Sequence, residues 1–363
     1  MNLSNSGDKY MKKKIIVGLS GGRDSAVAAL LLHRNGWDVT AVYLKLFSDA
    51  VSDSGKLHEN DARNVSEFLD IPFRKIDISQ RFETEVLRRF VQEYLNGRTP
   101  NPCIYCNPLV KFKALLEEAD NLGIDYIATG HYVRTSHTPG SSSPLLLKAK
   151  DLSKDQSYFL SRLTPKQIAG FIAPLGELSF RKTINFAREA KLPITEKPSS
   201  QEICFVSRHY SEFLLSRKEA ADYIKEGEIV HTNGKVIGTH RGLPFYTIGQ
   251  RSGLGIAWEH PLYVIRIDTM NNRLIVGPQD ETFTETFQAE DINWIRKPEG
   301  RESFHCDIKI RHRHNPTPAK VQIHNNSKKI KVVFEKPQRA VTPGQTAALY
   351  DGDAVLGSGI ISL

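Results

Sequence analysis

A glycine-rich turn between an apolar run and a helical run constrains the fold of this chain most. Residues 14–19 have the pattern of a short buried strand, and residues 18–25 read Gly-Leu-Ser-Gly-Gly-Arg-Asp-Ser. A helical pattern follows at once. Such a turn lets backbone N–H groups and a helix N-terminus approach phosphate groups closely. A plain strand-to-helix turn is the alternative, and the combination of glycines, two serines and an aspartate favours the anion site.

Apolar runs of two kinds alternate along the first third of the chain. Residues 14–19, 38–44, 73–77 and 126–128 are typical of strands, whereas residues 25–35, 58–69, 82–96 and 110–121 have helical spacing. This order predicts an α/β domain with a doubly wound parallel sheet. We expect loops at residues 97–108 and 137–144, and further helices at 165–171 and 181–190.

The pattern changes near residue 227 to short alternating runs separated by turn sequences, which predicts small β domains. At 363 residues the chain is long enough for two or three domains. We expect a polar tail at 1–12, a catalytic domain at 13–210, a small central β module at 220–285 and a C-terminal β-barrel at 286–363.

Charge and hydropathy indicate a cytoplasmic protein with a polyanionic partner and no membrane segment. The formal net charge is +8, which favours such a partner without proving one. No run approaches the roughly 20 apolar residues that span a bilayer, and the apolar stretch at 15–19 is too short for a signal peptide. In a reducing cytosol the four cysteines should be thiols unless chemistry uses them.

The glycine-rich turn lacks the lysine that a Walker A loop carries. It resembles instead the S-G-G-x-D-S loop of the ATP pyrophosphatase (PP-loop) superfamily, whose members cleave ATP to AMP and pyrophosphate while adenylating a substrate oxygen. That resemblance implies a bound Mg²⁺ on the leaving pyrophosphate, with Asp24 helping to hold it. The implied ATP-binding residues are Gly18, Leu19, Ser20, Gly21, Gly22, Arg23, Asp24 and Ser25, with Leu44 beside the adenine.

The cysteines need separate explanations. Cys103 and Cys106 lie three residues apart, but a structural zinc site would need a second pair of ligands that the sequence does not offer. Cys204 alone would more often be a core cysteine. Cys306 alternates with Ile308 and Ile310, which places it in the barrel core.

Several further motifs occur in one order with the glycine-rich turn. They are G-R-T-P-N-P-x-x-x-C-N at 97–107, A-T-G-H-Y at 128–132, K-D-Q-S-Y-F-L at 154–160, I-C-F at 203–205, G-Q-R-S-G-L-G-I at 249–256 and V-T-P-G-Q at 341–345. Together they resemble the tRNA-specific 2-thiouridylase family (MnmA/TrmU) from about residue 14 to residue 363. The resemblance implies ATP-dependent 2-thiolation of the wobble uridine, U34, of tRNA.

The same resemblance implies roles for individual residues. Cys106 matches the nucleophile and Cys204 the cysteine that carries a persulfide, and the two would form a transient disulfide. The implied partners are the tRNA anticodon loop, a persulfide sulfur carrier or cysteine desulfurase relay, and a reductant. Asn101, Pro102 and Cys103 match the target-base contact, Gly130 matches an ATP contact, and His131, Lys154, Asp155, Gln156, Arg311, His312 and Gln345 match tRNA contacts.

Two positions depart from the family pattern, because many relatives have Asp where this chain has Cys103 and Ser199. Cys103 could transfer protons with a pKa depressed by Lys111 and Lys113, could fill space beside the base, or could resolve the persulfide. An iron–sulfur cluster held by Cys103, Cys106 and Cys204 is an alternative cofactor. Other readings are a ligase that amidates a small molecule and an inactive RNA-binding module.

A basic surface is expected on the C-terminal barrel. Lys309, Arg311 and Arg313 alternate and would share one strand face, as a ladder for phosphates. Residues 320–339 hold six Lys or Arg against one Glu, an excess that would attract an RNA backbone.

Overall fold

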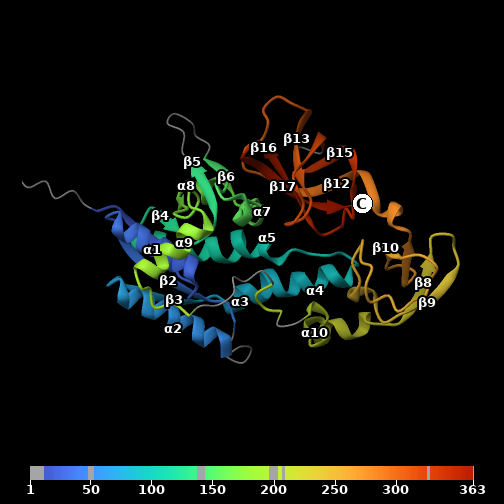
Figure 1. Cartoon of the computed structure of the whole chain (residues 1–363), viewed down its shortest axis with the longest axis horizontal. Coiled ribbons are helices and arrows are strands. Elements are labelled where there is room, and N and C mark those ends of the chain that lie inside the picture. The colour runs from blue at the N-terminus through green and yellow to red at the C-terminus, as the bar shows by residue number, and fades with distance from the viewer. Residues whose placement is uncertain are drawn as a thin grey trace, which may run out of the picture.

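The computed structural model describes residues 12–47, 53–136, 144–195, 203–206, 209–324 and 328–362. Most of the expected polar tail, nearly all of the 137–144 loop and Ser199 lie outside these residues. Figure 1 shows three parts along the long axis, with the parallel sheet at one end, the red barrel beside it and a small sheet within residues 227–277 at the other end.

A five-stranded parallel sheet forms the first part, in the order β3-β2-β1-β4-β7. Ile15 and Val17 of β1 face a core with the helices α1, α2 and α9, whereas Ile16 faces a second core with α6 (Lys113–Leu122). Helices therefore cover both faces, which confirms the doubly wound α/β fold. The elements are β1 (Lys14–Gly18), α1 (Arg23–Arg34), β2 (Asp38–Lys45), α2 (Asp53–Phe68), β3 (Phe73–Asp77), β4 (Tyr126–Ala128), β7 (Phe171–Ile172) and α9 (Phe180–Glu189).

Two long helical runs each contain a π-helical turn. The first joins α3 (Ser79–Phe82), η1 (Glu83–Leu87) and α4 (Arg88–Leu95), and the second joins α5 (Pro102–Cys106), η2 (Asn107–Phe112) and α6 (Lys113–Leu122). The predicted loop at 97–108 was therefore wrong beyond residue 101. Asn101 caps the second run through the N–H of Cys103, and Pro102 occupies its first turn, where a missing N–H costs nothing.

The chain between β4 and the second sheet forms short elements. A hairpin of β5 and β6 leaves the parallel sheet toward the barrel, and the predicted helices at 165–171 and 181–190 correspond to α8 and α9. These short elements are β5 (Val133–Ser136), β6 (Leu145–Lys148), η3 (Leu152–Lys154), α7 (Ser157–Leu160), α8 (Pro165–Ala169), α10 (Tyr210–Leu215) and η4 (Lys218–Tyr223). The 3-10 turn η5 (Leu243–Phe245) follows later, among the strands of the second sheet.

The second sheet has four strands in the order β10-β11-β8-β9, packed on an apolar core that includes Ile229, Phe245 and Val276. It corresponds to the expected central β module. Its strands are β8 (Gly227–His231), β9 (Val236–His240), β10 (Tyr263–Asp268) and β11 (Arg273–Gly277), and η6 (Gln279–Thr282) leads on to the barrel.

The barrel consists of six antiparallel strands in the order β12-β15-β14-β13-β16-β17, closed by the pairing of β12 with β17. The β5–β6 hairpin continues it, because Leu147 of β6 pairs with Ala354 of β17. The expected β-barrel is therefore present, with two strands of the first part added at one edge. Its strands are β12 (Phe283–Trp294), β13 (Ser303–Lys309), β14 (Thr317–His324), β15 (Lys329–Arg339), β16 (Thr346–Asp351) and β17 (Ala354–Ser362).

Across the described ranges, no helix combines the length and the apolar character needed to cross a membrane.

Candidate active site

The glycine-rich turn lies at the carboxyl end of β1 and leads directly into α1, the place where open α/β sheets bind ligands. The Ser20 N–H donates to Ser25 Oγ (3.1 Å), and Ser25 Oγ donates to the Gly22 carbonyl (2.9 Å). Gly21 has a φ of +76°, and a Cβ there would lie 2.3 Å from the His58 carbonyl oxygen. The turn is thus closed by its serines and requires a glycine at position 21.

Gly130 packs against the same helix N-terminus from the end of β4. A Cβ at this position would lie 2.6 Å from the backbone nitrogen of Ser25 and 2.7 Å from the carbonyl carbon of Asp24. Backbone atoms at this distance cannot move aside as a flexible side chain could. Gly130, predicted to contact ATP, therefore borders the first turn of α1.

Asp24 has two described partners in this first turn. Its Oδ1 accepts from the Tyr132 hydroxyl (3.2 Å) and lies 3.3 Å from Arg23 Nε. Its side chain is 32% exposed, so it remains accessible to a ligand. Tyr132 is a neighbour that the sequence analysis did not identify, although it belongs to the A-T-G-H-Y motif.

Basic side chains gather beside the turn. The Arg23 guanidinium lies 4.6 Å from the Phe180 ring centroid, and Lys154 Nζ lies 3.7 Å from the same centroid. The family resemblance implies that Lys154 contacts tRNA, but in the structure Lys154 and Arg23 both lie over the Phe180 ring. One aromatic ring thus holds two cations next to the predicted phosphate site.

The predicted cysteines converge, although Cys204 is about 100 residues from Cys106 in the chain. Cys106 is buried at the end of α5, in an apolar cluster that also includes Phe205. The Phe205 ring packs edge-on against Phe90 and Phe82, with centroid distances of 5.1 Å and 6.0 Å. This anchor holds the neighbouring Cys204, which is exposed, beside the start of the second helical run.

Charge interactions show that three thiols and one lysine form a single group. Cys103, Cys106 and Cys204 each interact electrostatically with Lys111. Burial raises the pKa of Cys106 to about 12, and Lys111 opposes that rise. Surrounding protein atoms also raise the pKa of Cys103 and of Cys204, even though Cys204 is accessible to solvent.

The directions of these pKa shifts bear on the three roles considered for Cys103, which are proton transfer, filling space and resolving the persulfide. A thiol with a depressed pKa would be needed for proton transfer, but the pKa of Cys103 is raised by burial, with Lys111 only partly opposing it. Lys113 is exposed and is not among the groups that act on Cys103. The proton-transfer alternative is therefore not favoured in this state of the chain.

All four cysteines are free thiols. Among the described residues, no group of three or more His, Cys, Asp or Glu side chains is arranged to hold a metal ion. Cys306 packs partly buried against the barrel core beside Ile308, which confirms its predicted place.

His131 is a further ionisable neighbour of Lys111. Its Nδ1 is 2.8 Å from Thr129 Oγ1, and its ring centroid is 6.3 Å from that of Phe112. Burial lowers the pKa of His131 to about 3, and the Lys111 charge acts in the same direction. His131 is therefore a neutral imidazole at physiological pH.

The other residues matched to tRNA contacts have described partners within the chain. Asp155 is buried and accepts from the Ala149 N–H (2.9 Å) and from Ser157 Oγ (2.7 Å). Gln156 Oε1 accepts from the Tyr132 N–H (2.9 Å). Asp155 and Gln156 thus stabilise the chain around β5 and α7, whatever else they contact.

Arg311 and His312 of the barrel meet α7. The His312 ring lies 4.5 Å from the Phe159 ring centroid. The Tyr158 hydroxyl donates to the Thr346 carbonyl (3.1 Å), and the side chains of Asn101 and Arg311 both act on the pKa of Tyr158. The structure therefore brings the predicted base-contact residue Asn101 and two predicted tRNA contacts of the barrel to the same pair of aromatic side chains.

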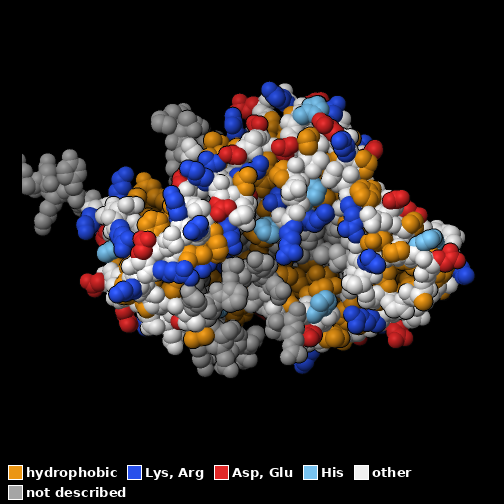
Figure 2. Space-filling model, in the orientation of Figure 1, with side chains coloured by type: hydrophobic (Ala, Val, Ile, Leu, Met, Phe, Trp, Pro, Cys, Tyr) orange, Lys and Arg blue, Asp and Glu red, His pale blue; other side chains and the backbone are white. Residues whose placement is uncertain are grey.

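The predicted basic ladder is wrong as a strand face. β13 ends at Lys309, and Arg311 and Arg313 lie in the turn that follows. Lys309 Nζ is 5.8 Å from the Tyr158 ring centroid, and Arg311 donates to the Arg339 carbonyl (3.0 Å). The alternation of basic residues in the sequence continues past the last paired residue of β13. Beyond that residue, alternation no longer determines the direction in which a side chain points. Figure 2 shows Lys and Arg side chains around the middle of one face, between the parallel-sheet part and the barrel.

Thr99 is a junction that the sequence analysis missed. Its N–H donates to the Pro343 carbonyl (2.8 Å), and its carbonyl accepts from Gln345 Nε2 (2.9 Å). Its hydroxyl lies 3.2 Å from the Thr247 hydroxyl. The segment before α5 is thereby held by both the barrel and the second sheet, and Gln345, matched to a tRNA contact, takes part in holding it.

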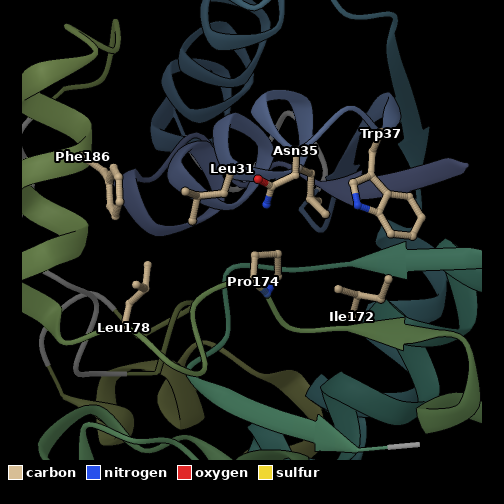
Figure 3. A pocket seen from close by; sticks show the side chains of 8 residues that line it. Leu31, Asn35, Trp37, Ile172, Pro174, Leu178 and Phe186 are labelled. Atoms are coloured by element: carbon tan, nitrogen blue, oxygen red, sulfur yellow. The ribbon is translucent and has the colours of Figure 1, made fainter. Parts of the chain in front are cut away.

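An apolar hollow of about 310 Å³ lies at the far end of α1, where Leu31, Pro174 and Phe186 face one another (Figure 3). It carries none of the predicted site residues.

Comparisons with known proteins agree with this arrangement. Residues 13–208 match the tRNA methyl transferase HUP domain family, residues 213–278 the tRNA methyl transferase PRC-barrel domain family and residues 284–361 the aminomethyltransferase beta-barrel domain family. The tRNA-specific 2-thiouridylase MnmA of Carboxydothermus hydrogenoformans is 41% identical, over 98% of this chain and 99% of that protein. That of Clostridioides difficile is 39% identical, over 97% and 99%.

Among solved structures, the U34-tRNA thiolase NcsA of Methanococcus maripaludis with its [4Fe-4S] cluster is 18% identical, covering 58% of this chain and 67% of that chain with a TM-score of 0.36. That likeness is too low to add to the assignment. The sequence relatives span nearly the whole chain, which also has the PP-loop turn and both converging cysteines, so the chain belongs to the tRNA-specific 2-thiouridylase family.

Proposed function

We propose that this chain catalyses the ATP-dependent 2-thiolation of the wobble uridine of tRNA. The observation that carries the proposal is the convergence of Cys106 and Cys204 in a chain that also has the PP-loop turn at β1 and relatives of this activity over nearly its full length. ATP would activate the uracil oxygen, and the two cysteines would supply sulfur.

The turn from Gly18 to Ser25 would bind ATP. Backbone N–H groups of the turn and the N-terminus of α1 would hold the phosphates, and Arg23 and Lys154 would add positive charge beside them. Leu44, near the end of the neighbouring strand β2, would contact the adenine.

The accessible carboxylate of Asp24 fits Mg²⁺ bound through substrate phosphates, because such sites usually need only one or two carboxylates. When bound there, Mg²⁺ would neutralise charge on the leaving pyrophosphate. The Tyr132 hydroxyl and Arg23 orient the Asp24 carboxylate.

Uracil O2 would attack the α-phosphorus of ATP, so that pyrophosphate leaves and the oxygen becomes part of an AMP leaving group. Asn101, Pro102 and Cys103 at the start of α5 would hold the base. A wobble uridine is accessible for this purpose, because anticodon loops offer unstacked bases.

Sulfur would arrive as a persulfide on Cys204, which is exposed and can meet a separate carrier. In one route the Cys106 thiolate attacks the Cys204 sulfur, which forms the Cys106–Cys204 disulfide and releases hydrosulfide. Hydrosulfide then attacks C2 of the adenylated uracil and AMP leaves. In the other route the Cys106 thiolate attacks C2 first and displaces AMP.

In that second route the terminal persulfide sulfur displaces Cys106 from C2, and Cys106 then attacks the Cys204 sulfur, so the new sulfur stays on C2. Both routes end with one disulfide, which an external dithiol reductant reopens. Both also need Cys106 as a thiolate.

The tRNA would lie over the face where Arg311 and His312 meet α7, close to Asn101. His131, which interacts with Lys111, and Lys154, which lies beside the nucleotide turn, are further proposed contacts. Asp155, Gln156 and Gln345 would act mainly by holding the surrounding chain in place. The proposal also includes a separate protein that carries the persulfide to Cys204, and a cytoplasmic location for the reaction.

The test is thiolation by the purified full chain, with tRNA, ATP, Mg²⁺ and a protein persulfide labelled in its sulfur. We expect labelled 2-thiouridine at position 34, by nucleoside mass analysis, together with AMP and pyrophosphate. Cys204→Ser should abolish both the product and the label on the protein, whereas Cys306→Ser is the matched control and should keep both. Pyrophosphate release stimulated by a small acid and indifferent to tRNA would instead favour a small-molecule ligase.

A further inference from the structure

Lys111 is a partly buried lysine whose described ionisable neighbours include all three thiols of the site. It lies in η2, five residues after Cys106. In an α-helix, residues three and four apart are neighbours, but a π turn is built on i→i+5 bonds. The single π turn at Asn107–Phe112 therefore brings Lys111 onto the side of Cys106.

The described ionisable neighbours of Lys111 are thiols and one histidine. Lys111 interacts with Cys103 and Cys106 of α5, with Cys204 of the 203–206 segment, and with His131 after β4. Within the described ranges, no Asp or Glu is among the groups that act on the pKa of Lys111. Among the described residues, the thiols are thus the potential counter-ions of this partly buried ammonium group.

We propose that Lys111 is a positioning residue that supplies the counter-charge for the thiolate and persulfide anions of Cys106 and Cys204. The inference rests on the proposed function, because only a reaction that passes through these anions needs such a charge. It assigns Lys111 a part in sulfur transfer rather than in ATP or tRNA binding.

The free-energy cost of a buried thiolate supports this role for Lys111. Burial disfavours the charged form of a thiol, and Cys106 is the more buried of the two reacting cysteines. Both routes of sulfur transfer nevertheless require its thiolate, which is the competent nucleophile. Lys111 lowers the pKa of each thiol against the effect of burial, and the thiols in turn raise the pKa of Lys111 against the same effect.

The neighbouring Lys113 offers a matched control. It lies in the same helical run only two residues further on, but it is exposed and is not among the groups that act on the thiols. Substituting it removes the same charge from the chain without removing it from the site.

The experiment measures how fast iodoacetamide alkylates each cysteine of the full chain as pH rises, without tRNA or ATP. Tandem mass spectrometry separates Cys103 from Cys106. Lys111→Met should slow alkylation of Cys106 and Cys204 by about tenfold at neutral pH, as expected for one pKa unit. Lys111→Arg and Lys113→Met should behave like the unsubstituted chain, and Cys306 should not respond to any of them.

Equal pH profiles of Lys111→Met and the unsubstituted chain at both Cys106 and Cys204 would overturn the proposal. If Lys111→Met does not fold, the reciprocal measurement decides. NMR of ¹³C-labelled lysine should show a lower pKa for Lys111 when Cys106 and Cys204 are both replaced by Ser, and an unchanged value would refute the coupling.

Thiolation assays separate this inference from the proposed function. Loss of turnover in Lys111→Met with recovery in Lys111→Arg, at unchanged KM for ATP and tRNA, is expected. An unsubstituted chain that does not thiolate tRNA at all would contradict the proposed function. The alkylation profiles would still test whether Lys111 supplies a counter-charge to the thiolates.

Discussion

Replacement of Gly130 by Ala tests the nucleotide site most directly. The new methyl group would lie 2.6 Å from the Ser25 nitrogen and 2.7 Å from the Asp24 carbonyl carbon, so the first turn of α1 must shift. Overpacking of this kind costs about 1–3 kcal/mol. If the free chain relaxes and ATP binding must restore the original turn, ATP affinity should fall roughly 5- to 150-fold. Isothermal titration with ATP measures the loss.

The control for this variant is Gly123→Ala at the end of α6. Gly123 has a φ of +64°, and a Cβ added there would meet nothing within 4 Å, so Ala adds backbone strain without a clash. That strain costs about 1–2 kcal/mol, a loss of stability comparable to that of Gly130→Ala. Gly123→Ala should nevertheless bind ATP normally. Unchanged ATP affinity in Gly130→Ala, at a similar loss of stability, would refute the assignment of this turn to ATP.

Three further predictions concern single residues. Asp24→Ala should remove tRNA-dependent pyrophosphate release but leave tRNA binding in a filter assay nearly intact, and undiminished release would argue against its role at the pyrophosphate. Cys103→Ala should keep thiolation within about tenfold, as a space-filling residue, whereas Cys106→Ala should abolish it; equal loss in both would give Cys103 a chemical role. The pKa of His131 is about 3 in the folded chain against an ordinary value of 6.5, so protonation opposes folding and stability should fall as pH drops below about 6.5. Denaturant unfolding at several pH values should show a smaller fall for His131→Asn, and an identical fall would place the cause elsewhere.

The sequence predicted four of the five strands of the parallel sheet, because their signals are local. It missed the two-residue strand β7, whose first residue, Phe171, lay at the end of the predicted helix at 165–171. The strands at 73–77 and 126–128 were placed at their observed bounds, and the PP-loop turn lies between β1 and α1 as expected. Alternation of apolar side chains and a glycine-rich turn depend on neighbouring residues only. The fold class could therefore be derived before any contact was known.

The start of α5 was misjudged for a local reason as well. Three prolines at 100, 102 and 108 indicated a loop, yet Pro102 occupies a first turn and Pro108 falls in a π turn. Asn101 is a residue type that commonly caps a helix N-terminus, and in the structure a helix begins here despite the prolines.

Other features of the site depend on contacts between distant segments. The approach of Cys204 to Cys106 depends on the packing of Phe205 against Phe90, and no pattern near Cys204 predicts it. The resemblance to a family supplied that pairing. The prediction of the basic ladder was wrong because alternation of side chains does not indicate where the pairing of β13 ends. The hydrogen bond from Gln345 to Thr99 could not be predicted because it joins segments far apart in the sequence.

The junction at Thr99 has a consequence for the order in which the protein matures on the ribosome. Domains usually fold from the N-terminus while the rest of the chain is still being made. The parallel sheet can form early, but Thr99 receives its bonds from Pro343 and Gln345 only when almost the whole chain has emerged. We therefore expect a nascent or truncated N-terminal fragment to bind ATP while its cysteine helix lacks its final anchor. Sulfur chemistry would begin only in the finished protein.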